Sequence, residues 1–198
     1  MASRLDSYIS ALAECLGAST VVDGSGTPLG LSDAVERTVE LVRTVHAAGG
    51  KLMFVGNGGS AGIASHATVD YTKNGGLRAL CFNDGAALTC YGNDLGFDQV
   101  FAAPILTHAA AHDLLIAISS SGRSPNILNA VAAARERRCH VVTLSGFSPQ
   151  NPLRGLGDLN FHVVSGEYGL VEISHMTLCH AVLDIFMGWK PEHIEKTG

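Results

Sequence analysis

The sequence has few charged residues, and the acidic ones are in excess. Asp, Glu, Lys and Arg make up 16% of the 198 residues, and the formal net charge is −5. Proteins that bind nucleic acid need a basic face, so we expect no nucleic-acid partner. A small phosphate needs only a few local donors and is not excluded. The low charge and a mean hydropathy of +0.23 also indicate that some apolar surface is buried between subunits.

Paired cysteines and long apolar runs are missing as well. The five cysteines are scattered and none belongs to a CxxC pair, so we expect free thiols in a reducing compartment. No apolar run approaches the ~20 residues that cross a bilayer. Residues 1–17, MASRLDSYISALAECLG, carry polar residues within an apolar periodicity, which predicts an amphipathic helix rather than a signal peptide. We therefore expect a cytoplasmic protein with no membrane partner.

Apolar residues and glycine are abundant. Hydrophobic residues make up 46% of the chain and there are 23 glycines, which is typical of an α/β domain. Short apolar segments alternate with helical periodicity, the pattern of βαβ units with a parallel sheet. The expected strands cover residues 51–55, 78–82, 114–119, 140–144 and 160–164. The expected helices cover residues 1–18, 32–48, 60–72, 97–110, 124–138 and 170–187.

These elements predict a three-layer αβα sandwich with a five-stranded parallel sheet. The length fits one domain, so we expect a single domain over residues 1–198. Within it we expect an N-terminal helix at 1–18, a turn-rich linker at 19–30 and the α/β core at 31–198. A second long loop is expected at 146–157.

A glycine-rich loop, VGNGGSA at residues 55–61, follows the first expected strand and precedes a helix. Glycines let the backbone approach a ligand, and a helix N-terminus offers free N–H groups to an anion. The loop also fits the dinucleotide-binding pattern GxGxxA, whose acidic partner could only be Asp84. A purely structural tight turn explains this loop equally well. The candidate ligand-binding residues here are Asn57, Gly58, Gly59 and Ser60.

Serines cluster in a second loop, ISSSGRSPN at residues 118–126, again between an expected strand and a helix. Ser124 can cap the helix and Pro125 suits its first turn. Ordinary turn serines are the alternative, but three serines beyond the cap exceed what capping requires. Two donor-rich loops at the carboxyl ends of parallel strands form one crevice, so we favour a sugar phosphate over a dinucleotide. The candidate phosphate ligands are Ser119, Ser120, Ser121 and Ser124.

Two helices carry titratable side chains. His66 and Asp70 are spaced i, i+4 and share one face of the helix after the first loop. Taken alone, they are better explained as a surface pair. The last helix contains Glu172, His175 and His180 in VEISHMTLCH, and such groups are costly to bury unless they are paired or metal-bound. We interpret His175 as a core or interface histidine.

In combination, these motifs resemble the sugar isomerase (SIS) domain family. GNGGSA with His and Asp after it, GND at residues 92–94, ISSSGRSPN, and a late helix with two histidines follow the family order from about residue 32 onward. Within the family, the chain is similar to the phosphoheptose isomerase branch. The resemblance implies a flavodoxin-like fold and a homotetramer, and it adds Asn93 and Asp94 to the substrate-binding residues. The implied reaction interconverts sedoheptulose 7-phosphate and D-glycero-D-manno-heptose 7-phosphate through an enediol, in heptose nucleotide and glycan precursor synthesis.

The resemblance also implies one zinc ion per subunit, bound by His66, Asp70, Glu172 and His180. It assigns the catalytic base to Asp70 and the acid to His180, and Asp70 and Glu172 also contact the substrate. The family has Glu and Gln where this chain has Asp70 and Glu172, and two carboxylates predict tighter metal binding with weaker Lewis acidity. Glu172 and His180 are eight residues apart, about 12 Å along a helix. They would have to lean together, or the ligands would come from two subunits.

Three other functions fit parts of the pattern. Non-catalytic SIS proteins that bind sugar phosphates or DnaA share the fold but lack the histidine and carboxylate set. A sugar-phosphate sensor would normally be joined to a DNA-binding domain, for which we expect neither room nor basic charge here. A dinucleotide-dependent dehydrogenase remains an alternative from the first loop alone. We favour the isomerase.

Overall fold

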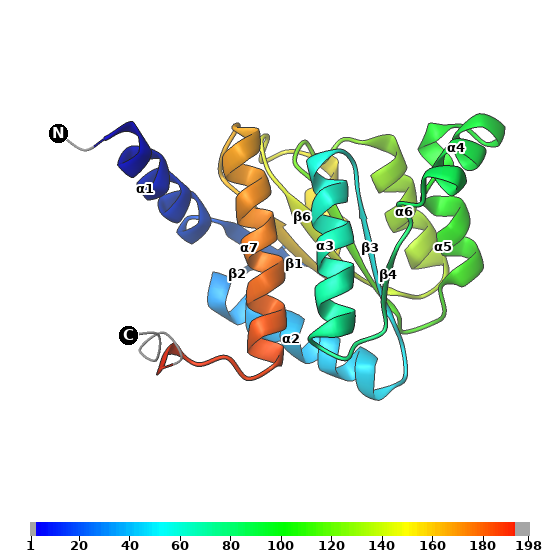
Figure 1. Ribbon diagram of the computed structural model, residues 1–198, viewed down its shortest axis with the longest axis horizontal. Coiled ribbons are helices and arrows are strands. Elements are labelled where there is room, and N and C mark those ends of the chain that lie inside the picture. The colour runs from blue at the N-terminus through cyan, green and yellow to red at the C-terminus, as the bar shows by residue number, and fades with distance from the viewer. Residues whose placement is uncertain (1–2, 193–198) are drawn as a thin grey trace.

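The computed structural model describes residues 3–192 and is built around a seven-stranded sheet (Figure 1). The strand order is β2-β1-β7-β6-β5-β3-β4. Strands β7, β6, β5, β3 and β4 are parallel to their neighbours in this series. Their bounds are β3 (Leu52–Gly56), β4 (Ala79–Cys81), β5 (Leu114–Ser119), β6 (His140–Ser145) and β7 (Leu159–His162). Strands β3 and β5 are buried along their whole length, as expected of strands covered on both faces.

Two further strands make the sheet mixed, so the prediction of five parallel strands was wrong in number. Strand β1 (Thr20–Asp23) runs antiparallel to β7 and pairs with β2 (Pro28–Leu29). Both lie within residues 19–30, which we predicted as a linker. The Asp23 carboxylate accepts hydrogen bonds from the N–H groups of Ser25 and Thr27, which stabilises the turn between the strands. The hairpin covers the β7 edge of the sheet.

Helices connect the strands close to where the sequence predicts them. Helix α3 begins at the glycine loop, α6 begins at the serine loop, and α7 is the late helix with the histidines. The predicted helix at 97–110 is split into η1 (Phe97–Gln99) and α5 (Ala102–His108), and η2 (Pro152–Gly155) lies in the predicted loop. Helix α4 was not predicted. The remaining bounds are α1 (Arg4–Gly17), α2 (Leu31–Ala47), α3 (Gly59–Lys73), α4 (Gly85–Asp94), α6 (Pro125–Glu136) and α7 (Tyr168–Phe186).

Side chains of the sheet alternate between two hydrophobic cores on its opposite faces. Leu52 and Phe54 belong to the core shared with α2, α3 and α7. Met53 and Val55 belong to the core shared with α5 and α6. This alternation follows from the two-residue period of a strand. The αβα sandwich is therefore confirmed, and α3 and α7 lie side by side on one face (Figure 1).

Helix α7 is long and apolar enough, by length and composition, to cross a membrane. It packs instead against α1, α2 and α3, and Val171, Leu178 and Leu183 on it are buried. The core thus accounts for the apolar side chains on its buried face.

The five cysteines are free thiols. Cys15, Cys139 and Cys179 are buried, whereas Cys81 is half-buried and Cys90 is exposed. Burial raises the pKa of Cys179 to about 12 and, together with the Asp113 carboxylate, that of Cys139 to about 11. These two thiols are consequently unreactive at neutral pH.

Candidate active site

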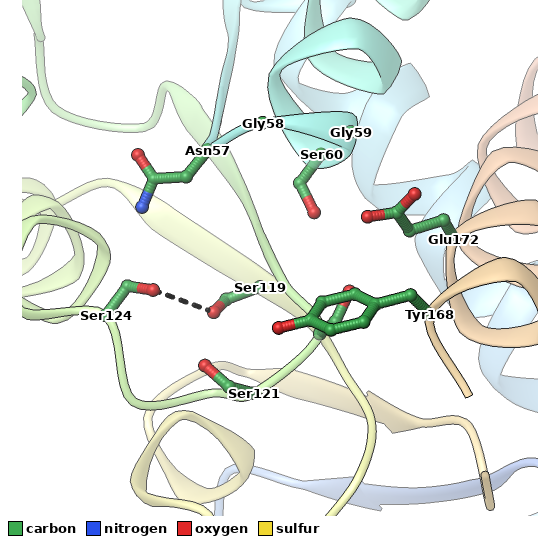
Figure 2. Close-up of a pocket in the computed structure, with 10 residues that line it drawn as sticks. Asn57, Gly58, Gly59, Ser60, Ser119, Ser121, Ser124, Tyr168 and Glu172 are labelled. Carbon is green, nitrogen blue, oxygen red and sulfur yellow. Dashed lines mark hydrogen bonds between the residues drawn. The ribbon is translucent and has the colours of Figure 1, made fainter. Parts of the chain in front are cut away.

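The glycine loop and the serine loop meet at the carboxyl ends of β3 and β5 and, with the start of α7, enclose a cavity of about 230 Å³ (Figure 2). The parallel register places Gly56 opposite Ile118, so the residues that follow them lie side by side. The cavity brings together both predicted loops and Glu172. Its lining residues are Asn57, Gly58, Gly59, Ser60, Ser119, Ser120, Ser121, Ser124, Tyr168 and Glu172.

Helices α3 and α6 both begin at this cavity without a side-chain cap. Gly58 occupies the N-cap position of α3 with φ 53°, a conformation that favours glycine. Ser124 occupies the N-cap position of α6, but its hydroxyl makes no capping bond and lies 3.5 Å from the Ser119 hydroxyl. Uncapped N-termini leave backbone N–H groups free and favour an anion. The cavity is thus well suited to a phosphate.

The serine hydroxyls are available to a ligand. The Ser120 hydroxyl is buried and has no partner among the described residues. Burying such a group unpaired costs about 1–3 kcal/mol, which a ligand oxygen would recover. The Ser119 and Ser121 hydroxyls accept bonds from the N–H groups of Gly122 (3.2 Å) and Arg123 (3.3 Å). The contact between the Ser119 and Ser124 hydroxyls uses the hydrogen of only one of them, so the loop keeps hydroxyl hydrogens that can donate to a ligand.

Asn126 and Asn151 are not among the predicted site residues, yet they hold the two loops in place. Asn57 and Asn126 exchange side-chain amide bonds of 2.9 and 2.8 Å, which link the glycine loop to α6. Asn151 lies behind the serine loop, where a Cβ on Gly122 would be 1.9 Å from its Oδ1. Asn126 belongs to the ISSSGRSPN motif and could have been noticed there. Asn151 gives no signal in the sequence, because its contact with Gly122 is tertiary.

A second cluster of polar side chains lies farther along α3 and α7. His66 Nε2 is 3.2 Å from His180 Nε2 and 3.1 Å from Asp70 Oδ2, and His180 Nδ1 is 3.8 Å from the same oxygen. One ligand atom from each of the three lies within 4.8 Å of the others. Tetrahedral ligands at about 2.0–2.1 Å from zinc would be about 3.4 Å apart. The spacing and the donor set of these three residues fit a divalent cation.

Glu172 lies outside this group of three and faces the serine cavity (Figure 2). Its Oε2 would lie 2.3 Å from a Cβ on Gly59, so the missing side chain at Gly59 makes room for the carboxylate. There the carboxylate is close to the positive end of the α3 dipole. Its role as a fourth metal ligand stays a prediction.

The positions of Asn93, Asp94 and Asp84 bear on the predicted substrate site and on the dinucleotide alternative. Asn93 and Asp94 are exposed at the end of α4, where Asn93 donates to Asp94 (2.8 Å), and neither lines the cavity. Asp84 is the N-cap of α4 and accepts a bond from the N–H of Ala87 (2.9 Å). The acid that a dinucleotide would require is therefore engaged in capping a helix.

Comparison with known proteins identifies the family. The sequence profile of the SIS domain matches residues 30–146. The chain belongs to the SIS domain family. A phosphoheptose isomerase of Bradyrhizobium sp. (strain ORS 278) is 36% identical over 196 residues, covering 93% of this chain and 94% of the relative. A phosphoheptose isomerase of Geobacter sp. (strain M21) is 36% identical over 161 residues, 78% of this chain and 83% of the relative.

Solved structures agree with this assignment. The phosphoheptose isomerase of Neisseria gonorrhoeae has a TM-score of 0.80 and 30% identity, and the alignment covers 94% of this chain and 98% of that one. The predicted resemblance to the phosphoheptose isomerase branch is confirmed. In this SIS domain the profile match includes both loops, His66 and Asp70, and the Bradyrhizobium relative extends the similarity over nearly the whole chain.

Two residues of α7 complete the surroundings of the site. His175 is fully buried, and its Nε2 lies 3.0 Å from the carbonyl oxygen of Ser145. Burial lowers the pKa of His175 to about 4, so the ring is neutral, in agreement with a core histidine. Only one ring nitrogen is satisfied, however, because the buried Nδ1 has no partner among the described residues. Tyr168 lines the cavity and was missed. An aromatic residue just after the last strand, at the same edge of the sheet as the loops, was the available signal.

Proposed function

We propose that this SIS domain interconverts sedoheptulose 7-phosphate and D-glycero-D-manno-heptose 7-phosphate, in the synthesis of heptose nucleotides and glycan precursors. One observation carries the proposal. A donor-rich cavity lies where α3 and α7 begin, and His66, Asp70 and His180 converge farther along these two helices. The phosphoheptose isomerases among its relatives support the assignment of the substrate.

The proposed substrate is bound by its phosphate. The free N–H groups at the starts of α3 and α6 and the hydroxyls of Ser119, Ser120, Ser121 and Ser124 would hold the phosphate oxygens. The sugar would then extend along α7, past Glu172 and toward His180. These two residues are eight positions apart, about 12 Å on a helix, so the arrangement favours a long sugar phosphate over a short one.

Isomerisation requires a base and an acid near the reacting carbons. Asp70 would take the proton from the carbon beside the carbonyl, and His180 would donate a proton to the carbonyl oxygen, which gives the enediol. Returning the proton to the neighbouring carbon, and taking one from the other oxygen, completes the conversion. His66 Nε2 lies 3.1 Å from the Asp70 carboxylate, so the two side chains share one site.

Zinc is the cofactor that we propose. His66, Asp70 and His180 would hold the ion, and Glu172 is the predicted fourth ligand. When bound, zinc would polarise the substrate carbonyl and stabilise the negative charge that develops on its oxygen.

We further propose a homotetramer that works in the cytoplasm. Exposed apolar side chains on α1, α3 and α7 support an oligomer, since Leu5, Val69 and Ile173 are 67%, 58% and 48% exposed. The free thiols support a reducing compartment. Sedimentation at several protein concentrations would test the oligomer, and a monomer at all of them would contradict it.

The test of the function is incubation with sedoheptulose 7-phosphate, with and without a chelator. We expect the wild type to convert it to the aldose, the chelator to stop the reaction, and added zinc to restore it. No turnover with any divalent metal would overturn the proposal. Retained binding of the sugar phosphate without turnover would then favour a non-catalytic SIS binding protein.

A further inference from the structure

Tyr168 belongs to neither of the two loops, yet it lines the same cavity. It is the first residue of α7 and is 62% exposed. Figure 2 shows its ring crossing the cavity, with the hydroxyl directed toward the side where Ser119 and Ser121 lie. An aromatic residue in this position covers one side of the proposed phosphate site.

The Tyr168 ring packs against one aromatic neighbour. The ring of Phe147 meets it edge-to-face, with centroids 4.8 Å apart and an angle of 81° between the planes. Phe147 has φ 57°, rare for an aromatic residue, and its N–H donates to the carbonyl oxygen of Ser165 (2.9 Å). The Ser165 hydroxyl in turn accepts a bond from the N–H of Glu167 (3.1 Å), next to Tyr168. The loops after β6 and β7 thus cooperate to hold Tyr168.

The charge of the cavity makes an additional neutral donor useful. Its ten lining residues include no Lys or Arg, and Glu172 adds a negative charge. A phosphate there depends on hydroxyl and backbone N–H donors, and each hydrogen bond gains strength when water is excluded. A tyrosine supplies both features, because its hydroxyl donates while its ring covers apolar and polar surface alike.

We propose that Tyr168 closes the phosphate end of the cavity, donating its O–H to a phosphate oxygen while its ring keeps water out. Tyr168 binds and positions the substrate and takes no part in proton transfer. The inference rests on the proposed function for the identity of the ligand. Its core, a tyrosine that closes an anion site, can be tested with inorganic phosphate alone.

The decisive variant is Tyr168→Phe, which removes only the hydroxyl and keeps the ring against Phe147. The matched control is Tyr8→Phe, a half-exposed tyrosine on α1 whose hydroxyl lies beside Gly169 of α7 but does not line the cavity. Calorimetric titration with inorganic phosphate gives Kd, and steady-state kinetics with sedoheptulose 7-phosphate give KM and kcat. We expect Kd and KM to rise about ten-fold in Tyr168→Phe, the loss of one hydrogen bond to a charged group, with kcat unchanged. Tyr168→Ala should raise both further, and Tyr8→Phe should change neither.

Unchanged Kd and KM in Tyr168→Phe would overturn the inference, and so would an equal effect in Tyr8→Phe. A fall in kcat at constant KM would also overturn it, because it would place the hydroxyl in the chemistry. A wild type that binds phosphate through Tyr168 but does not isomerise the heptose phosphate would support the inference and overturn the proposed function. A wild type with neither phosphate binding nor turnover overturns both.

Discussion

Replacing Gly122 by alanine tests how the serine loop is held. Gly122 has φ 62°, and a Cβ there would lie 1.9 Å from Oδ1 of Asn151. Asn151 is buried, so its carboxamide cannot turn outward without losing its partners. The methyl group would therefore force either the loop or Asn151 to move.

The expected cost follows from these contacts. An L-residue in the left-handed region loses about 1–2 kcal/mol. The Asn151 side chain donates to the carbonyl oxygen of Ser148 (2.8 Å) and accepts from the N–H of Arg154 (3.1 Å). Each of these bonds contributes about 1 kcal/mol to stability. Gly122→Ala should thus lower the free energy of unfolding by about 3–4 kcal/mol.

Urea unfolding followed by circular dichroism measures this loss, and Gly26→Ala is the matched control. Gly26 has φ 84°, but a Cβ there meets nothing within 4 Å, so only the backbone cost of about 1–2 kcal/mol applies. Phosphate affinity should fall at least ten-fold in Gly122→Ala and stay constant in Gly26→Ala. The double variant Gly122→Ala, Asn151→Gly should lose less stability than the sum of the losses in the two single variants, because the clash between the new Cβ and Asn151 is gone.

Equal losses of stability in Gly122→Ala and Gly26→Ala would refute this reasoning. Such a result would mean that the loop accommodates a side chain without displacing Asn151. Full additivity in the double variant would lead to the same conclusion.

Three more predictions follow from the site and its surroundings. Asp70→Asn and His180→Ala should each lower kcat for sedoheptulose 7-phosphate at least a hundred-fold at unchanged phosphate affinity, and variants within ten-fold of wild type would contradict the assigned roles. His175 has a pKa of about 4 in the folded protein, against 6.5 for an ordinary histidine, so acidification protonates the unfolded chain first. The free energy of unfolding should therefore fall by roughly 3 kcal/mol as the pH drops from 6.5 to 4. Urea titrations across this range should show a flatter profile for His175→Gln, and parallel profiles would count against the burial of the ring. Gly59→Ala places a methyl 2.3 Å from the Glu172 carboxylate and should displace that carboxylate. We expect kcat/KM to fall about ten-fold, with a change of less than about 1 kcal/mol in the free energy of unfolding. An unchanged kcat/KM would show that catalysis does not use the present position of Glu172.

The parallel part of the sheet was predictable because its strands are short and apolar on both faces. LLIAIS at β5 is such a segment, and its six residues are all buried. The β1–β2 hairpin was not predictable in the same way. Of β1 only Val21 is buried, and its partner Phe161 in β7 comes from the other end of the chain. Turn residues dominate its local signal.

The candidate site, like the fold, was predictable only where its features are contiguous in the sequence. The two loops were found from sequence because a strand, a donor-rich turn and a helix start are contiguous features. The convergence of His66 and Asp70 with His180 depends on the packing of α3 against α7, and only the family resemblance anticipated it. The placement of Glu172 over Gly59 and of Tyr168 against Phe147 depends on tertiary packing, which no local pattern encodes.

The most direct test of the account is the fate of the transferred proton. Sedoheptulose 7-phosphate would be incubated with the wild-type protein in D2O and followed by NMR. The Asp70 side chain is 19% exposed, so a proton held on it can exchange with solvent. We predict that deuterium appears at C2 of the aldose product and at C1 of the recovered ketose, and that Asp70→Asn abolishes both signals. Conversion without deuterium in either sugar would contradict transfer through a base that exchanges its proton with solvent, the role assigned to Asp70.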